Sequence, residues 1–213
     1  DSLKCNQYMI CLNNKKISTC VVDNSLKPQN LVGMSREELT KVVDKLSEKS
    51  FRVKQLWHEL YHRGTKNFND MSTLSKDFRE KLKKDFTISR PEIVLEKTSS
   101  DKSKKWLLKF EDGATIESVY IPEEDRGAVC VSTQVGCNAG CVFCNTGHQG
   151  FSRNLTAYEI VSQFMIVRDA YNEWPTPTSE TRYISNVVVM GVGEPFFNYE
   201  NTAKALKIIM DGD

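Results

Sequence analysis

The 213-residue sequence has no run of about 18 apolar residues, the length that a membrane-spanning helix needs. Its first residues, DSLKCNQYMICLNNKK, also lack a basic start followed by an apolar core, so they do not resemble a secretory signal. These two absences predict a cytoplasmic protein with no membrane association. The length allows one large domain or two small ones.

The chain has almost no net charge, +1 in total, but the charge is unevenly distributed. Residues 1–110 carry 23 Lys and Arg against 14 Asp and Glu, whereas residues 111–213 carry 6 against 14. A basic first half indicates a surface for a polyanion such as nucleic acid. A solvated charged face produces the same pattern, so charge alone does not decide between the two.

Seven cysteines would suit a disulfide scaffold in a small secreted protein, but the missing signal and the clustered spacing favour a metal centre in a reducing compartment. Three cysteines lie in a polar leader without any motif: Cys5, Cys11 and Cys20. Three others, Cys137, Cys141 and Cys144, follow the spacing C-x3-C-x2-C inside VGCNAGCVFCNTG.

A fourth ligand is lacking beside these three cysteines. Zinc normally takes four, and the nearest other thiol and imidazole belong to Cys130 and His148. Iron–sulfur clusters are normally held by four cysteines, so three thiolates fit a 4Fe–4S cluster with one iron left open. This spacing is that of the radical S-adenosylmethionine (SAM) superfamily, in which the open iron chelates SAM. An incomplete zinc-binding module is the alternative.

Helical periodicity dominates the first part of the chain. Ser35-Arg-Glu-Glu38 is a capping box that predicts a helix with Leu39, Val42, Val43 and Leu46 on one face. A second helix is expected from Val53 to a stop at Gly64, and a third near residues 75–85 with a basic outer face.

His58 and His62 lie four residues apart on the second predicted helix, a spacing that suits a metal. Because no third ligand lies nearby, a packing or surface role is favoured for both.

From Glu92 the period changes to that of strands. Short strands are expected at 93–95, 106–110 and 115–121, with a hairpin at Asp112-Gly113, and another at 128–133 that runs into the cysteine loop. A helix at 156–171, a strand at 186–190 and a last helix follow. Alternating strands and helices predict an α/β fold with a parallel sheet or barrel, in which sites lie at the carboxyl ends of the strands.

The loop Gly191-Val-Gly-Glu-Pro195 follows the last predicted strand. Its glycines allow the backbone to approach a ligand closely, and Glu194 could pair with an ammonium group such as the methionyl amine of SAM. A plain strand-to-helix turn would have the same composition.

Several longer segments resemble the RlmN family of dual-specificity radical SAM RNA methyltransferases. They are IESVYIPEEDRGAVC, VSTQVGCNAGCVFCNTGHQGFSRNLTAYEIVSQ, NVVVMGVGEPFFNYEN and the helical stretch FRVKQLWHELYHRGTKNFNDMSTLSKDFREKL. The resemblance covers about residues 35–213 and implies a methyltransferase for carbon-2 of an adenine in 23S rRNA and in tRNA. Cfr, which modifies another carbon of the same base, is a close relative and an alternative.

The resemblance also implies roles for individual residues. Cys137, Cys141 and Cys144 match the cluster ligands; Gly193 and Glu194 match the SAM-contacting pair; Glu117 matches the proton acceptor and Cys130 the cysteine that resolves a covalent protein–RNA intermediate, leaving a disulfide bond. From residue type alone, Glu117 would be a carboxylate on a strand face and Cys130 a buried strand cysteine. The implied partners are 23S rRNA, tRNA and an electron donor such as a flavodoxin or ferredoxin, for a monomer.

The family carries its methyl group on a cysteine near the C-terminus, but no cysteine follows Cys144 here. We therefore expect an N-terminal portion of a longer enzyme, inactive alone; a non-catalytic RNA- or cluster-binding fragment is the alternative. The expected architecture is a small helical domain followed by the first units of a partial parallel (β/α) radical SAM barrel. It divides into a leader of uncertain order at 1–30, a helical RNA-engaging domain at 31–90, a β-hairpin linker at 91–127 and the start of the radical SAM core at 128–213.

Overall fold

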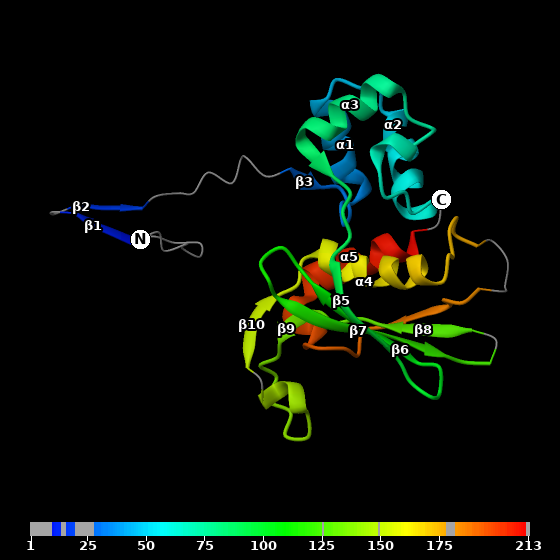
Figure 1. Cartoon of the computed structure of the whole chain (residues 1–213). Coiled ribbons are helices and arrows are strands. Elements are labelled where there is room, and N and C mark those ends of the chain that lie inside the picture. The colour runs from blue at the N-terminus through cyan, green and yellow to red at the C-terminus, as the bar shows by residue number, and fades with distance from the viewer. Residues whose placement is uncertain are drawn as a thin grey trace.

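A computed structural model (Figure 1) describes residues 10–13, 16–19, 28–124, 126–148, 150–177 and 182–211. In the leader it describes strands β1 (Ile10–Asn13) and β2 (Lys16–Thr19), which pair antiparallel. For residues 1–9, 14–15 and 20–27, which include Cys5 and Cys20, the expectation of uncertain order lies outside the described residues.

Residues 29–87 form a mostly helical unit, called the helical front from here on. Its helices are α1 (Arg36–Lys45), α2 (Phe51–Trp57), the π-helix η2 (His58–His62), the 3-10 helix η3 (Phe68–Asp70) and α3 (Lys76–Asp85). The predicted capping box is present, because the Ser35 hydroxyl accepts from Glu38 N–H and the Glu38 carboxylate accepts from Ser35 N–H. Strands β3 (Gln29–Asn30) and β4 (Phe86–Thr87) pair parallel and bring the two ends of this unit together.

The second predicted helix is present, but it changes type halfway along. From His58 the helix widens, and Arg63 N–H donates to His58 C=O, five residues back, at 2.9 Å. This wider turn buries Glu59 and Leu60 side by side. The rings of His58 and His62 stack with centroids 4.4 Å apart, in agreement with the packing role favoured for them.

A five-stranded sheet forms the second part of the molecule, in the order β11-β8-β7-β6-β5. The strands are β5 (Glu92–Thr98), β6 (Lys104–Lys109), β7 (Thr115–Pro122), β8 (Gly127–Cys130) and β11 (Asn186–Val188). β5 to β8 are antiparallel neighbours, and β11 runs parallel to β8. The predicted α/β class is confirmed, with the parallel part of the sheet made by β8 and β11.

Two helices, α4 (Ala157–Ala170) and α5 (Tyr199–Met210), cover one face of this sheet and lie between it and the helical front (Figure 1). On β7, Ile116, Ser118 and Tyr120 are buried on that face, whereas Glu117 and Ile121 are exposed on the other. The alternation leaves the second face of the sheet open.

The strand predicted at 128–133 ends earlier than expected. β8 stops at Cys130, and after a short irregular stretch β9 (Gln134–Gly136) pairs antiparallel with β10 (Phe151–Asn154) outside the main sheet. Beyond Cys130 the chain still bonds to β11, since Val131 N–H donates to Val188 C=O at 2.9 Å. Thr133 C=O then accepts from Leu155 N–H, at 2.9 Å, beside the start of α4. β11 likewise ends at Val188, short of the predicted Met190.

The helical front is attached to the sheet unit through α4. Asp169 of α4 forms ion pairs with Arg90 (3.2 Å) and Lys66 (3.1 Å). Gly33 lies against the backbone at Tyr158, where an added Cβ would come within 2.4 Å of it. Apolar side chains of both parts join in one continuous core.

Among the described residues, none of the helices combines the length and the apolar character that crossing a membrane requires.

Candidate functional site

The three clustered cysteines lie in the loop that joins β9 to β10. The base of this loop is tight: Cys137 N–H donates to Gly150 C=O at 3.0 Å, and Gly136 has φ +74°. A Cβ on Gly136 would lie 1.9 Å from the Gly150 oxygen, so the base of the loop admits no side chain there. The β9–β10 hairpin, residues 134–154, therefore fixes both ends of the segment that carries the thiols, and is called the cysteine hairpin below.

Exposure differs among the three thiols. Cys137 is buried at the base, Cys144 is half-buried and Cys141 is exposed. Hydrogen bonds from the backbone at Gly147 and Thr146 lower the pKa of the Cys144 thiol and so favour its thiolate.

Three thiols in one short loop are the donor type that iron–sulfur clusters take, and a thiolate is the form that binds metal. In the part of the chain that the structure describes, no three His, Cys, Asp or Glu side chains are arranged to hold a metal ion. The four cysteines whose side chains are described, Cys130 and these three, are free thiols.

The second predicted motif, the glycine loop, follows β11 and leads into the 3-10 helix η5 (Pro195–Asn198) and α5. Gly193 has φ +105°, and a Cβ there would come within 2.6 Å of the Gln134 side chain. The Glu194 carboxylate caps η5 by accepting from Phe196 N–H at 3.1 Å.

The structure brings the two motifs together. β8 and β11 are parallel neighbours with Cys130 opposite Val188, so the loops that follow them leave the sheet at the same edge. Gly191 N–H donates to Val131 C=O (3.0 Å), and Thr133 N–H donates to Val192 C=O (2.8 Å). Residues 191–194 thus lie directly against the segment that enters the cysteine hairpin.

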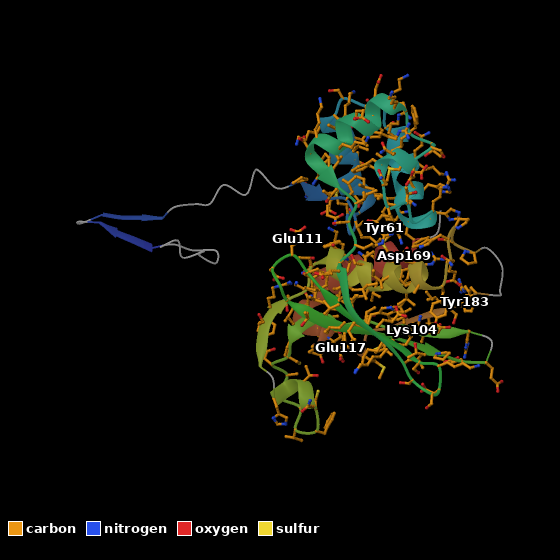
Figure 2. The ribbon with its side chains drawn as sticks, in the orientation of Figure 1. Tyr61, Lys104, Glu111, Glu117, Asp169 and Tyr183 are labelled. Carbon is orange, nitrogen blue, oxygen red and sulfur yellow. The ribbon has the colours of Figure 1, made fainter. Side chains whose placement is uncertain are left out.

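Glu117 and Cys130 share the open face of the sheet. Cys130 pairs across to Val119, which lies two residues from Glu117 and therefore on the same side of β7. Glu117 is half-exposed and forms an ion pair with Lys105 at 3.0 Å. Burial raises the pKa of the Cys130 thiol, and a backbone hydrogen bond from Met190 offsets only part of that effect. In Figure 2, Glu117 lies below the sheet, whereas Tyr61 and Asp169 lie on the helical side.

Sequence reasoning missed the polar residues that hold these loops. Ser132, Gln134 and Asn198 are all buried, and each has a side-chain hydrogen bond to the backbone of another segment. Gln134 and Ser132 stand just before the VGC motif in a stretch where buried strand residues are expected to be apolar. That mismatch is the signal that could have found them.

Comparison of the sequence with known proteins identifies the family to which this chain is similar. The family model described as the ribosomal RNA large subunit methyltransferase N-terminal domain matches residues 29–88. The chain is 55% identical over 186 residues to the dual-specificity RNA methyltransferase RlmN of Rhodospirillum rubrum, which covers 87% of this chain and 44% of that protein. The chain belongs to the RlmN family. The Gluconobacter oxydans RlmN is 53% identical over 188 residues, covering 87% of this chain and 46% of the relative.

A solved structure supports the RlmN assignment at the level of fold. The crystal structure of a radical SAM methyltransferase from Sphaerobacter thermophilus superposes with a TM-score of 0.76 at 34% identity, over 86% of this chain and 52% of that one. The chain thus spans about half the length of the RlmN proteins that it matches.

Proposed function

We propose that these residues form the cluster-binding and SAM-contacting part of a radical SAM methyltransferase that methylates carbon-2 of an adenine in 23S rRNA and tRNA. The observation that carries the proposal is the juxtaposition of the cysteine hairpin and the Gly193–Glu194 loop after two parallel strands, in a chain 55% identical to an RlmN protein. The arrangement follows the general rule that sites in α/β folds lie at the carboxyl ends of parallel strands.

In this proposal Cys137, Cys141 and Cys144 hold a 4Fe–4S cluster, and the fourth iron position remains available to SAM. Gly193 lets the backbone approach the ligand, and Glu194 pairs with its ammonium group. When bound, the cluster and SAM supply the one-electron chemistry that an electron-poor aromatic carbon requires.

The open face of the sheet supplies the remaining groups. Glu117 accepts the proton that leaves carbon-2 of the base. The Cys130 thiolate attacks the sulfur of the thioether that joins a second cysteine to the base. A disulfide forms, the sulfur–carbon bond breaks, and its electron pair and a proton complete the methyl group. The second cysteine has no counterpart among residues 145–213.

The helical front is proposed to engage the RNA. Helix α3 carries more cations than carboxylates, and Lys81 and Lys83 pair with Glu48 and Glu80. Its cations are Lys76, Arg79, Lys81, Lys83 and Lys84, and its carboxylates are Asp77, Glu80 and Asp85. Cations at this density favour a phosphate backbone. The proposal also divides the chain after residues 30, 90 and 127 into leader, helical domain, hairpin linker and radical SAM core. The protein is proposed to be cytoplasmic and monomeric and to take electrons from a flavodoxin or ferredoxin.

Anaerobic reconstitution tests the proposal. The chain is incubated with iron and sulfide, and iron, sulfide and zinc are then quantified together with the visible absorption. We expect about four irons and four sulfides per chain, the composition of a 4Fe–4S cluster, and loss of both in Cys141→Ala. A full cluster in Cys141→Ala, or zinc in place of iron, would overturn the assignment.

A further inference from the structure

A buried amide joins the two loops of the candidate site. Gln134, on β9, is 1% exposed, and its Oε1 accepts from Glu194 N–H at 2.9 Å. Its Nε2 donates to Asn154 Oδ1 on β10 at 2.8 Å. Asn154 Nδ2 in turn donates to Phe197 C=O at 3.2 Å. One chain of hydrogen bonds therefore runs from Glu194, in the Gly193–Glu194 loop, through the cysteine hairpin to Phe197 in η5.

The orientation of both amides in this chain is determined by its ends. The Glu194 N–H can only donate, which requires the oxygen of Gln134, and the Phe197 carbonyl can only accept, which requires the nitrogen of Asn154. With these ends fixed, Gln134 nitrogen meets Asn154 oxygen, and every donor faces an acceptor. A single arrangement satisfies the whole chain, so it holds the two loops in one register.

A second bridge lies beside the first. Asn198, 3% exposed, donates through Nδ2 to Thr133 C=O (2.8 Å) and to Leu155 C=O (2.7 Å), while its Oδ1 accepts from Asn201 at 2.9 Å. These carbonyls flank the β9–β10 hairpin on both sides. Both ends of the hairpin are thus tied to the segment that follows Glu194.

Packing alone does not require a glutamine at position 134. The side chain covers Gly193, and an apolar residue of the same length would cover it equally well. What an apolar residue could not do is accept from Glu194 N–H, and a buried polar group without a partner is costly. The amide group itself is therefore what the site requires.

We propose that Gln134, supported by Asn154, is a positioning residue that fixes the Gly193–Glu194 peptide relative to the cysteine hairpin, so that the amino-acid end of SAM is held at a set position beside the cluster. This inference rests on the proposed function for the identity of the ligand. The placement of the peptide stands on the hydrogen bonds alone.

The first experiment measures backbone hydrogen exchange in the metal-free 213-residue chain, with Gln134→Met as the test. We expect the Glu194 amide to exchange about tenfold faster, as loss of one buried hydrogen bond predicts. Asn154→Ala, at an exposed position, is expected to give a smaller change in the same direction. Unchanged exchange at Glu194 in both variants would overturn the proposal.

Gln163→Met is the matched control. Gln163 is also a buried glutamine, and its amide bonds Ser132 from the side of α4: Oε1 accepts from Ser132 N–H at 2.8 Å and Nε2 donates to Ser132 C=O at 2.9 Å. We expect it to lower overall stability while leaving Glu194 exchange, relative to the rest of the sheet, unchanged. An equal effect in Gln163→Met would mean that Gln134 acts through general stability, which would also overturn the proposal.

The second experiment titrates SAM into cluster-loaded protein and follows the electron paramagnetic resonance spectrum of the reduced cluster. Gln134→Met is expected to keep its iron content and to bind SAM about tenfold more weakly. Equal affinity in wild type and variant would overturn the positioning role while leaving the proposed function intact. Wild-type protein that holds a cluster but binds no SAM would instead overturn the proposed function, and the hydrogen-exchange result would still decide whether Gln134 places the loop.

Discussion

At the scale of single residues, the cysteine hairpin depends on positions where the backbone leaves no room for a side chain. Gly136 and Gly140 have nearly the same positive φ, +74° and +72°. A Cβ on Gly136 would collide with the Gly150 carbonyl at 1.9 Å, whereas nothing lies within 4 Å of a Cβ on Gly140. Substituting Gly140 therefore tests the effect of the positive φ alone, whereas substituting Gly136 tests the positive φ together with the steric collision.

Gly136→Ala is expected to disrupt the base of the hairpin, because the strain of a positive φ is joined by the collision. Gly140→Ala should cost only about 1 kcal/mol for the left-handed conformation. The measurements are urea unfolding and iron uptake on reconstitution, with Gly140→Ala retaining iron and Gly136→Ala losing most of it. Equal iron uptake by the two variants would show that the close approach at Gly150 does not matter.

Cys130 is the second residue whose environment makes a prediction. Burial raises the pKa of its thiol, so its thiolate fraction at pH 8 is smaller than that of an exposed cysteine. In metal-free protein we expect iodoacetamide to modify Cys130 several-fold more slowly than Cys141, and the difference to vanish in urea. Mass spectrometry of the alkylated peptides over pH 7–10 measures both rates. A Cys130 that reacts as fast as Cys141 in the folded chain would contradict the prediction.

At the scale of elements, the π-turn η2 is built around a buried carboxylate. Glu59 accepts from Thr65 Oγ1 (2.8 Å), from Thr73 Oγ1 (2.7 Å) and from Thr73 N–H (3.1 Å). Burial acts to raise the pKa of Glu59, but the hydrogen bonds from Thr73 and Thr65 outweigh it and lower the pKa below its ordinary value. The carboxylate thus joins η2 to the loop that precedes α3.

Glu59→Gln is expected to lower the free energy of unfolding by about 2 kcal/mol at pH 7, because a neutral amide loses the charge-assisted hydrogen bonds from Thr65 and Thr73 and the ion pair with Arg63 at 3.5 Å. A lowered pKa means that the stabilisation is complete above the ordinary carboxyl pKa and is lost as pH falls through the folded-state value. The difference between wild type and variant should therefore shrink towards pH 3, as measured by urea unfolding at several pH values.

Glu80→Gln serves as the control for this experiment. Its carboxylate is exposed on α3 and pairs with Lys83 at the surface. We expect no measurable change in unfolding. A pH-independent loss of stability in Glu59→Gln would indicate that packing, and not the charged carboxylate, is what the π-turn needs.

At the scale of the whole molecule, Asp169 connects the helical front to the sheet unit. Its carboxylate meets Arg90 at 3.2 Å with both side chains nearly buried, and it also accepts from Trp174 Nε1 at 2.7 Å. Arg90 in turn donates to Gly64 C=O, at the end of the π-turn, at 3.2 Å. The Arg90–Asp169 pair is thus one of several contacts that place the front relative to the site, alongside the ion pairs of Arg36 with Asp211 and of Lys204 with Glu38.

Asp169→Asn is expected to destabilise the contact between the two parts by about 3 kcal/mol, since it leaves a nearly buried guanidinium without its counter-ion. Asp85→Asn, which removes the exposed pair with Lys45, is the control and should change little. Limited proteolysis between residues 88 and 92, together with urea unfolding, measures the effect. Equal protease resistance in the two variants would contradict the role given to Asp169.

What the sequence determined by itself is local. The capping box at Ser35, the strand period of residues 115–121 and the spacing of the three cysteines depend on neighbours a few residues away, and α1 and β7 form where the first two patterns predict them. The family resemblance added roles for Glu117, Cys130, Gly193 and Glu194, and these stay predictions.

What only the tertiary structure decided is which of these local features meet. The parallel pairing of β8 with β11 joins two loops separated by about 50 residues, and the antiparallel register of β7 on β8 sets Cys130 and Glu117 on one face. Which strands far apart in the sequence pair with each other, as β8 and β11 do, is decided by the packing of the whole fold, so no short pattern in the sequence contains it. For the same reason the polar bridge through Gln134 could not be predicted: it depends on a partner at Glu194 that only the folded chain brings within hydrogen-bonding distance.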